Sequence, residues 1–281
     1  MNTLQTRITL GVIMFAAFFG VLAVDAIFKT DIGFGCLAII VCGVGLYEFY
    51  NIATKNGFSP FRISGIFIGV WLFISYWLTV RKGSDVIQHF FRHETVIVLI
   101  FWLFLIQAFA RSTKDAIKNI SVTFFGVLYV SFLLSYAIAL RHLNYGTSVL
   151  IMVLLVSKFG DIGGYLLGRK FGKYKLAKVI SPNKTIEGAC FSLSFSVLIA
   201  VVFNLIPQTR VISISWAVLF GLIVGFSAMM GDLAESLLKR DSNVKDSSNI
   251  VPAFGGALDV IDCLLVSMPV AYYFITFFKL V

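Results

Sequence analysis

Long uninterrupted apolar stretches are the feature that most constrains how this chain can fold. A helix needs about 20 apolar residues to cross the hydrocarbon core of a bilayer. Stretches of this kind lie at about residues 8–28, 32–50, 63–80, 95–110, 120–140, 147–167, 188–206, 213–231 and 260–278. Their apolar residues are continuous and do not alternate with polar ones, which disfavours a transmembrane β-barrel. The sequence therefore predicts an all-α, polytopic integral membrane protein with about nine transmembrane helices.

The composition excludes the soluble alternatives. Apolar residues make up 59% of the 281 residues and charged residues 13%, against about 25% charged in a soluble globular domain. A mean hydropathy of +0.93 is too high for a soluble enzyme, a disordered chain or a fibrous repeat. The stretch 8–28 is too long for a signal-peptide core, so we expect an uncleaved span. The four cysteines lie inside apolar stretches without a Cys-x-x-Cys pair, which predicts free thiols rather than disulfides or zinc ligands.

The net charge of +9 and its distribution predict an orientation. In a membrane protein this excess indicates anionic headgroups, an anionic substrate or cytoplasmic loops, and not nucleic acid. The N-terminus is grouped with the loops 51–62, 111–119, 168–187 and 232–259. This side then carries 15 Lys/Arg and the opposite side 7, which places the N-terminus in the cytoplasm and the C-terminus outside. The last two of these loops decide the orientation, because without them the counts are 6 and 7.

Polar residues concentrate in the C-terminal half of the chain. Eight of the 14 acidic residues lie between Asp161 and Asp262. We therefore divide the chain into N-terminal membrane helices at 1–146 and a C-terminal catalytic membrane region at 147–281. The two polar loops of this second region, 168–187 and 232–259, are expected to face the cytoplasm from the inner membrane.

The first polar region (Lys158 to Glu187) begins inside an apolar stretch. Lys158 and Asp161 are ionisable residues at membrane depth, where a charge is costly and by default indicates a functional site. Their i, i+3 spacing also fits a simple ion pair. Glycine recurs at every fourth position from Gly160 to Gly172, which favours close helix packing, either within the chain or in a homodimer.

The end of this region has the residues of a phosphate site. Six Lys/Arg between positions 169 and 184 fit either an anionic lipid surface or a phosphate. Ser181 opens a Ser-Pro-Asn turn, and Lys184 and Thr185 follow at the start of the next apolar stretch. Helix N-terminal amides, a Lys and a Thr hydroxyl together suit a phosphate, although the glycines of a P-loop are missing.

The second polar region (Gly231 to Asp262) has the residues of a metal site. Asp232, Glu235 and Ser236 lie at i, i+3 and i+4, so on a helix all three can face one point, and Lys239 continues this face. Such oxygen ligands suit Mg²⁺, which takes one or two carboxylates and leaves its other positions to water and substrate phosphates.

The remainder of the second polar region adds cations and a second pair of acids. Arg240 and Lys245 join Lys239 as phosphate-binding candidates, and the low-bulk turn Phe254-Gly255-Gly256 leads to Asp259 and Asp262. A solvated loop of neutralising charges is the alternative for any one residue. The whole set favours metal-assisted phosphoryl or nucleotidyl transfer. His89, His93 and Glu94 have metal-like spacing but lie on the opposite side, where we favour a surface helix.

The second polar region resembles the signature of the phosphatidate cytidylyltransferases (CDP-diacylglycerol synthases). The matching pattern is Ser236-x-x-Lys239-Arg240-x4-Lys245-Asp246, followed by Pro252-x-x-Gly255-Gly256-x-x-Asp259-x-x-Asp262. Upstream, Asp161 and the segment Ser181-Pro-Asn-Lys-Thr-Ile-Glu187-Gly are also similar to that family. Two positions depart from it, because Phe254 replaces a usual histidine and Val260 a usual arginine.

The resemblance implies that CTP and phosphatidate react in the bilayer to give CDP-diacylglycerol and pyrophosphate. It also implies roles for the residues of both polar regions, as a catalytic set, a metal set and a substrate-binding set. The catalytic set is Asp232, Asp259, Lys239 and Asp246. The metal set, for Mg²⁺ with an optional second cation, is Asp232, Asp259, Asp246 and Asp161. The substrate-binding set is Ser181, Lys184, Thr185, Glu187, Ser236, Arg240, Lys245, Gly255 and Gly256.

Three alternatives remain open at the level of sequence. A polyprenol or phytol kinase-like enzyme would also use CTP but would transfer the γ-phosphate. A transporter would use Lys158 and Asp161 along an ion path. A scaffold protein would have lost catalysis through the changes at Phe254 and Val260.

Overall fold

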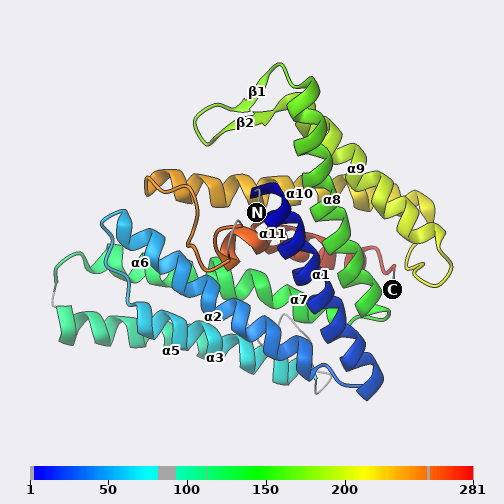
Figure 1. Cartoon of the computed structure of the whole chain (residues 1–281). Coiled ribbons are helices and arrows are strands. Elements are labelled where there is room, and N and C mark those ends of the chain that lie inside the picture. The colour runs from blue at the N-terminus through cyan, green and yellow to red at the C-terminus, as the bar shows by residue number, and fades with distance from the viewer. Residues whose placement is uncertain (1–2, 82–92, 112, 252–253, 281) are drawn as a thin grey trace. The chain divides into compact units, whose positions relative to one another are not determined.

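The computed structural model describes residues 3–81, 93–111, 113–251 and 254–280, and these are mostly helical (Figure 1). The α-helices are α1 (Thr3–Phe28), α2 (Ile32–Lys55), α3 (Arg62–Val80), α5 (His93–Ile106), α6 (Ala116–Gly126), α7 (Leu133–Arg141), α8 (Gly146–Phe171), α9 (Ile186–Leu205), α10 (Ile214–Asp241) and α11 (Ala257–Phe277). Two short π-helical segments, η1 (Gln107–Arg111) and η2 (Val127–Phe132), continue α5 and α6. The strands β1 (Lys175–Ala177) and β2 (Ser181–Thr185) pair antiparallel, with Lys175 opposite Thr185 and Ala177 opposite Ser181.

Membrane-spanning helices account for most of the described chain, so the predicted class of all-α integral membrane protein is confirmed. Within the described residues, eight helical segments are long and apolar enough to cross a bilayer. They are Thr9–Phe28, Ile32–Lys55, Arg62–Val80, Ala116–Arg141, Gly146–Phe171, Ile186–Leu205, Ile214–Asp241 and Ala257–Phe277. The predicted ninth span at 95–110 corresponds to a shorter apolar helix, Val98–Ala110, and is not among them.

The helices that flank the two polar loops continue into them. Helix α8 ends at Phe171 and helix α10 at Asp241, which agrees with the helical spacing predicted for Asp232, Glu235 and Ser236. A helix can continue past the apolar stretch when its polar residues pair at i, i+4. The first loop also contains the β1–β2 hairpin, which the all-α prediction did not include and which projects beyond α8 and α9 (Figure 1).

Contacts within the chain define two compact units. Unit 1 comprises Met1–Ile138 with Asp241–Val260, and unit 2 comprises Ala139–Arg240 with Ile261–Val281. The sequence-based division at 146 and 147 separates membrane helices from a catalytic region and stays a prediction.

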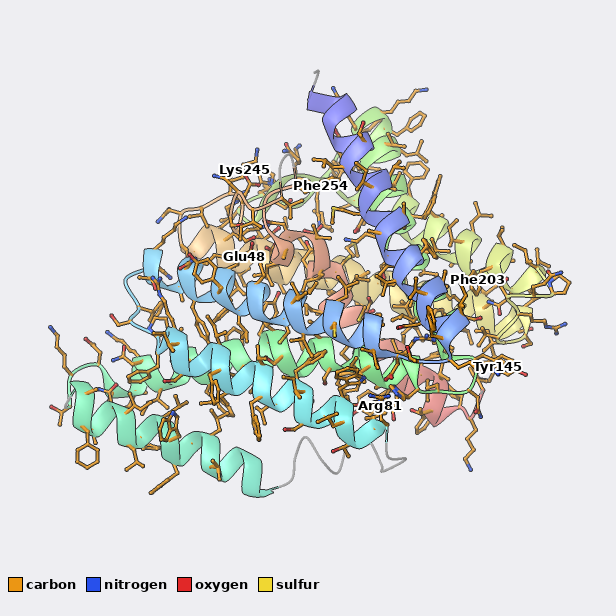
Figure 2. The ribbon with its side chains drawn as sticks, turned by 60° about the horizontal axis from the view of Figure 1, so that its bottom comes forward. Glu48, Arg81, Tyr145, Phe203, Lys245 and Phe254 are labelled. Carbon is orange, nitrogen blue, oxygen red and sulfur yellow. The ribbon has the colours of Figure 1, made fainter. Side chains whose placement is uncertain are left out.

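In unit 1, helix α2 is fixed at both ends. At its start, Asp31 accepts a hydrogen bond from Trp77 Nε1 (2.7 Å) and pairs with Arg81 (3.1 Å), which lies at the end of α3 (Figure 2). Towards its end, the buried Tyr50 hydroxyl donates to the carbonyl of Thr123 (2.8 Å). These contacts therefore fix the position of α2, including its C-terminal half, within unit 1.

In unit 2, small residues bring α8 and α9 together. A Cβ at Gly160 would collide with Ser196 Oγ, and one at Gly168 would lie 2.9 Å from the Cα of Gly188. The Ser196 hydroxyl in turn donates to the carbonyl of Val156 (3.1 Å). The close packing predicted from the glycine spacing is thus confirmed as a contact within the chain.

Candidate active site

The start of α9 is built by two residues of the predicted phosphate site. Thr185 is the N-cap of the helix, and its hydroxyl accepts a hydrogen bond from the Gly188 amide (3.1 Å). The Glu187 carboxylate accepts from the amides of Lys173 (3.0 Å) and Tyr174 (3.2 Å), which fixes the chain as it enters the hairpin. Both residues therefore hold the local backbone, and their predicted contact with substrate stays a prediction.

Carboxylates and lysines from three helices and the hairpin gather in unit 2. Asp232 on α10 forms an ion pair with Lys184, and Ser236 Oγ donates to Asp232 Oδ1 (3.4 Å). Asp161 on α8 interacts electrostatically with Lys158, Lys184 and Asp232. Asp262 on α11 interacts electrostatically with Lys158, Asp161 and Asp232. We call these five charged residues (Lys158, Asp161, Lys184, Asp232 and Asp262) the charged cluster of unit 2.

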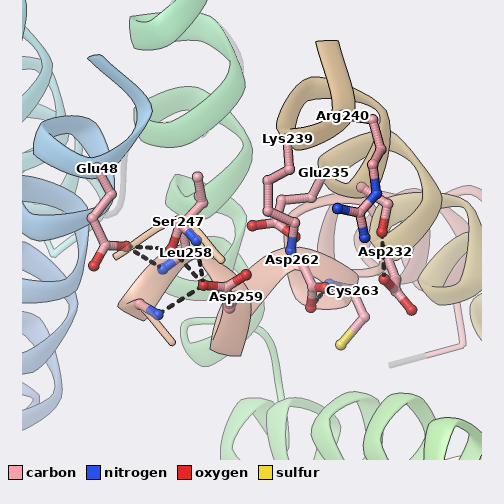
Figure 3. Close-up of polar contacts among 12 residues, drawn as sticks. Glu48, Asp232, Glu235, Lys239, Arg240, Ser247, Leu258, Asp259, Asp262 and Cys263 are labelled. Carbon is pink, nitrogen blue, oxygen red and sulfur yellow. Dashed lines mark hydrogen bonds and ion pairs between the residues drawn. The ribbon is translucent and has the colours of Figure 1, made fainter. Parts of the chain in front are cut away.

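A second group on α10 is separate from this cluster in its pairing. Glu235 is completely buried and forms an ion pair with Lys239, which is 9% exposed (Figure 3). Asp232 and Glu235, which the sequence placed on one face, therefore have different lysine partners. The next residue, Arg240, is exposed and donates from Nε to the carbonyl of Ile180 (3.3 Å), beside Ser181 at the start of β2.

In unit 1, the start of α11 holds Asp259 in a defined position. Asp259 Oδ2 accepts hydrogen bonds from the Ser247 amide (2.8 Å), the Ser247 hydroxyl (2.6 Å) and the Gly256 amide (2.7 Å). A carboxylate three residues into a helix that accepts from the N-cap amide is half of a capping box. Gly255 has a φ of +101°, a conformation that favours glycine, and a Cβ there would press on the same Asp259 oxygen.

Glu48 on α2 is the site residue that the sequence reasoning missed. Its buried carboxylate accepts from the Ser247 hydroxyl and the Leu258 amide (Figure 3), and also from the Ser248 hydroxyl and the Ala257 amide. A glutamate inside the apolar stretch 32–50 was the signal that could have identified it, because ionisable residues at membrane depth are by default functional.

The exposed residues of the 242–256 loop include the predicted Lys245 and Asp246. Lys245 and Phe254 both lie on this loop (Figure 2). Phe254, which stands where the resembled family usually has histidine, lies against α1, because a Cβ at Gly11 would be 3.5 Å from Cζ of its ring. Its amide donates to the carbonyl of Val251 (3.1 Å), which closes the turn before Gly255.

The donor chemistry of the predicted metal residues suits a hard cation. Asp161 and Asp232 belong to unit 2 and Asp246 and Asp259 to unit 1, and all four offer carboxylate oxygens. In the described part of the chain, no three or more His, Cys, Asp or Glu residues form a ready cage for a metal ion. Mg²⁺ needs no such cage, since it usually binds one or two carboxylates and keeps waters and substrate phosphates. The predicted histidine site, at His89, His93 and Glu94, lies outside the side chains that the structure describes.

Known proteins resemble this chain over nearly its full length. The family model described as the cytidylyltransferase family matches residues 5–278. A phosphatidate cytidylyltransferase of Chlamydia pneumoniae is 31% identical over 258 residues, which cover 88% of this chain and 83% of the relative. Those of Haemophilus influenzae and Synechocystis are each 28% identical, with 98% and 86% of this chain covered and 99% and 88% of the relatives. This chain is therefore a nucleotidyltransferase enzyme that belongs to the cytidylyltransferase family.

Proposed function

We propose that this enzyme transfers the cytidylyl group of CTP to phosphatidate and releases pyrophosphate. The observation that carries the proposal is the full-length similarity to proteins named phosphatidate cytidylyltransferase, together with the family match over residues 5–278. The product is CDP-diacylglycerol, an activated lipid for phospholipid biosynthesis. Integral membrane helices suit this reaction, because the acyl chains of the lipid substrate stay in the bilayer while its phosphate reacts.

The reaction needs little acid or base catalysis. A phosphate oxygen of phosphatidate attacks the α-phosphorus of CTP, a new P–O bond forms, and the bond to the β-phosphate oxygen breaks. The attacking oxygen is already an anion near neutral pH, so catalysis consists mainly of positioning and of neutralising charge. The family's usual histidine, replaced here by Phe254, is therefore not required as a base by this chemistry.

The basic residues are proposed to bind the phosphates of the two substrates. Lys184, Arg240 and Lys245 supply positive charge, and Ser181 lies at the start of β2, next to the carbonyl that Arg240 contacts. Lys184 and Asp232 form an ion pair in which each can change partner when substrate binds. Substrate phosphate can replace Asp232 beside Lys184, and a divalent cation can replace Lys184 beside Asp232. After this exchange Lys184 would bind substrate, and neither the lysine nor the aspartate would lack a partner of opposite charge.

A bound Mg²⁺ would neutralise the triphosphate and polarise the α-phosphorus. We propose that Asp232 and Asp259 are its main carboxylate ligands, with Asp161 and Asp246 as the further acids of the predicted set. The hard carboxylate oxygens of these residues support the choice of this cation over a softer metal.

We also propose that the enzyme lies in the inner membrane with its active site towards the cytoplasm. The support is the Lys/Arg content of the two polar loops, six in 168–187 and three in 232–259. CTP is highly charged and cannot cross a bilayer unaided, so the active site must face the compartment that contains CTP, and we propose that this is the cytoplasm.

Labelled CTP separates this function from its alternatives. Purified enzyme in phosphatidate-containing micelles with Mg²⁺ is given CTP labelled with ³²P at either the α or the γ position. Cytidylyl transfer moves only the α label into lipid and releases the γ label as pyrophosphate. Label in lipid from the γ position alone would instead identify a lipid kinase, and no lipid product at all would favour a transporter or scaffold.

A further inference from the structure

The first turn of α11 has no capping side chain at its N-cap position. The N-cap position is occupied by Gly256, which has no side chain to accept hydrogen bonds from the free amides of the helix. Glu48 Oε1 accepts from the Ala257 amide (3.1 Å), and Oε2 accepts from the Leu258 amide (2.7 Å). A residue 209 and 210 positions earlier in the chain therefore caps this helix.

The same carboxylate also fixes the loop that precedes α11. The Ser248 hydroxyl donates to Glu48 Oε1 (2.6 Å), and the Ser247 hydroxyl lies 3.2 Å from Oε2. Two amides, the Ser248 hydroxyl and the Ser247 hydroxyl that Asp259 shares thus converge on a side chain that is 0% exposed. A negative charge at this point also interacts favourably with the N-terminal end of the helix dipole.

These contacts lead directly to Asp259. Ser247 and Gly256, which supply all three hydrogen bonds to Asp259 Oδ2, both lie against Glu48. A Cβ at Gly256 would collide with Ser247 Oγ and with both carboxylate oxygens of Glu48. Glu48 and Asp259 therefore both hold the turn at Gly256, and the Ser247 hydroxyl lies between their carboxylates.

We infer that Glu48 is a positioning residue that holds the Asp259 carboxylate and the start of α11 in their reactive arrangement. The inference rests on the proposed function insofar as Asp259 acts in cytidylyl transfer. Glu48 itself acts through Ser247 and the first amides of the helix, and its place on α2 is fixed by the packing of that helix in unit 1.

The substitution Glu48→Gln tests this with little change of shape. It replaces one acceptor oxygen by an NH₂ donor that faces other donors, so part of the hydrogen bonding at the start of α11 is lost. Asp25→Asn is the matched control. Asp25 is a carboxylate 1% exposed in the same unit, and it accepts from the amides of Gly33 and Phe34 (both 2.9 Å) at the start of α2.

Two measurements on both full-length variants in detergent decide the matter. Hydrogen exchange followed by mass spectrometry reports protection of the amides at 256–259 and at 33–34. Steady-state kinetics with CTP and phosphatidate report kcat and KM. For Glu48→Gln we expect faster exchange at 256–259 and a fall in kcat of about 10–100-fold, as for residues that orient catalytic carboxylates, with KM for CTP little changed. For Asp25→Asn we expect faster exchange at 33–34 only and kcat near that of the wild type.

Other outcomes overturn the inference. Unchanged exchange at 256–259 in Glu48→Gln would show that the carboxylate does not hold this turn. Faster exchange with the kcat of the Asp25→Asn control would make Glu48 a structural residue only. If Glu48→Gln does not fold, Ser248→Ala removes one donor from the same carboxylate and must shift exchange and kcat in the same direction. A wild type that makes no lipid product would refute the proposed function, while the exchange measurement would still decide whether Glu48 holds the turn.

Discussion

The buried ion pair of Glu235 and Lys239 allows a test of whether Lys239 acts on substrate or on the fold. Lys239→Met would leave the Glu235 carboxylate, which is 0% exposed, without its cation. Removing one partner of a buried pair costs about 3–5 kcal/mol, because a charge then stays in a medium of low polarity without compensation. The double variant Glu235→Met with Lys239→Met removes both charges, and such apolar replacements of buried pairs are often neutral or stabilising.

An exposed pair in the same chain provides the control for this experiment. Lys118 and Asp115 are 3.4 Å apart at i, i+3, with side chains 68% and 47% exposed. Lys118→Met should cost at most about 1 kcal/mol, the range of surface pairs. Unfolding in detergent with increasing denaturant measures all three variants against the wild type. A loss for Lys239→Met no larger than that for Lys118→Met would refute the reasoning from burial.

Activity of the double variant then separates the two roles of Lys239. If the lysine neutralises substrate phosphate, the double variant is stable and has lost cytidylyl transfer. If the lysine serves only to compensate Glu235, the double variant is stable and active. Either result is informative, because the double variant removes the destabilisation that would otherwise obscure the catalytic effect of Lys239→Met.

Three further predictions concern backbone and carboxylate roles in the two units. Gly256→Ala should lower both stability and kcat, because its Cβ would collide with neighbouring side chains, whereas Gly20→Ala, with no atom within 4 Å, should be close to neutral in the same thermal unfolding assay. Thr185→Ala should cost about 1 kcal/mol of unfolding free energy through loss of the N-cap of α9, and an unchanged midpoint would contradict that role. Asp232→Asn and Asp259→Asn should each strongly reduce transfer of α-labelled CMP to lipid, and chelation of Mg²⁺ in the wild type should abolish it reversibly; full activity of either variant would remove that residue from the site.

The transmembrane helices could be predicted from the sequence because a bilayer selects them by length and apolarity alone. Their polar ends could not be predicted in the same way. The apolar stretch ends at 231, because hydropathy falls at Asp232, but α10 continues through the paired Glu235 and Lys239 and ends at Asp241.

Side-chain partners that are distant in sequence explain what the sequence reasoning missed at the site. Lys184 was predicted to bind phosphate, but its pairing with Asp232 depends on how the hairpin returns to α10. Glu48 was overlooked because its partners lie 199 to 210 residues further along the chain. Charge and spacing could indicate which residues carry chemistry, but they could not show that Lys239 is buried and paired with Glu235.

The two acids of the second polar region have different partners, and this affects how their variants must be interpreted. Asp259 accepts hydrogen bonds from Ser247 and Gly256, whereas Asp262 interacts with Lys158 and with other carboxylates of the charged cluster of unit 2. Loss of activity in Asp259→Asn could therefore arise from a displaced helix start as well as from a missing metal ligand. The Mg²⁺ dependence of residual activity separates the two causes. A lost ligand raises the Mg²⁺ concentration needed for half-maximal rate, whereas a displaced turn lowers the rate at saturating Mg²⁺ and increases amide exchange at 256–259.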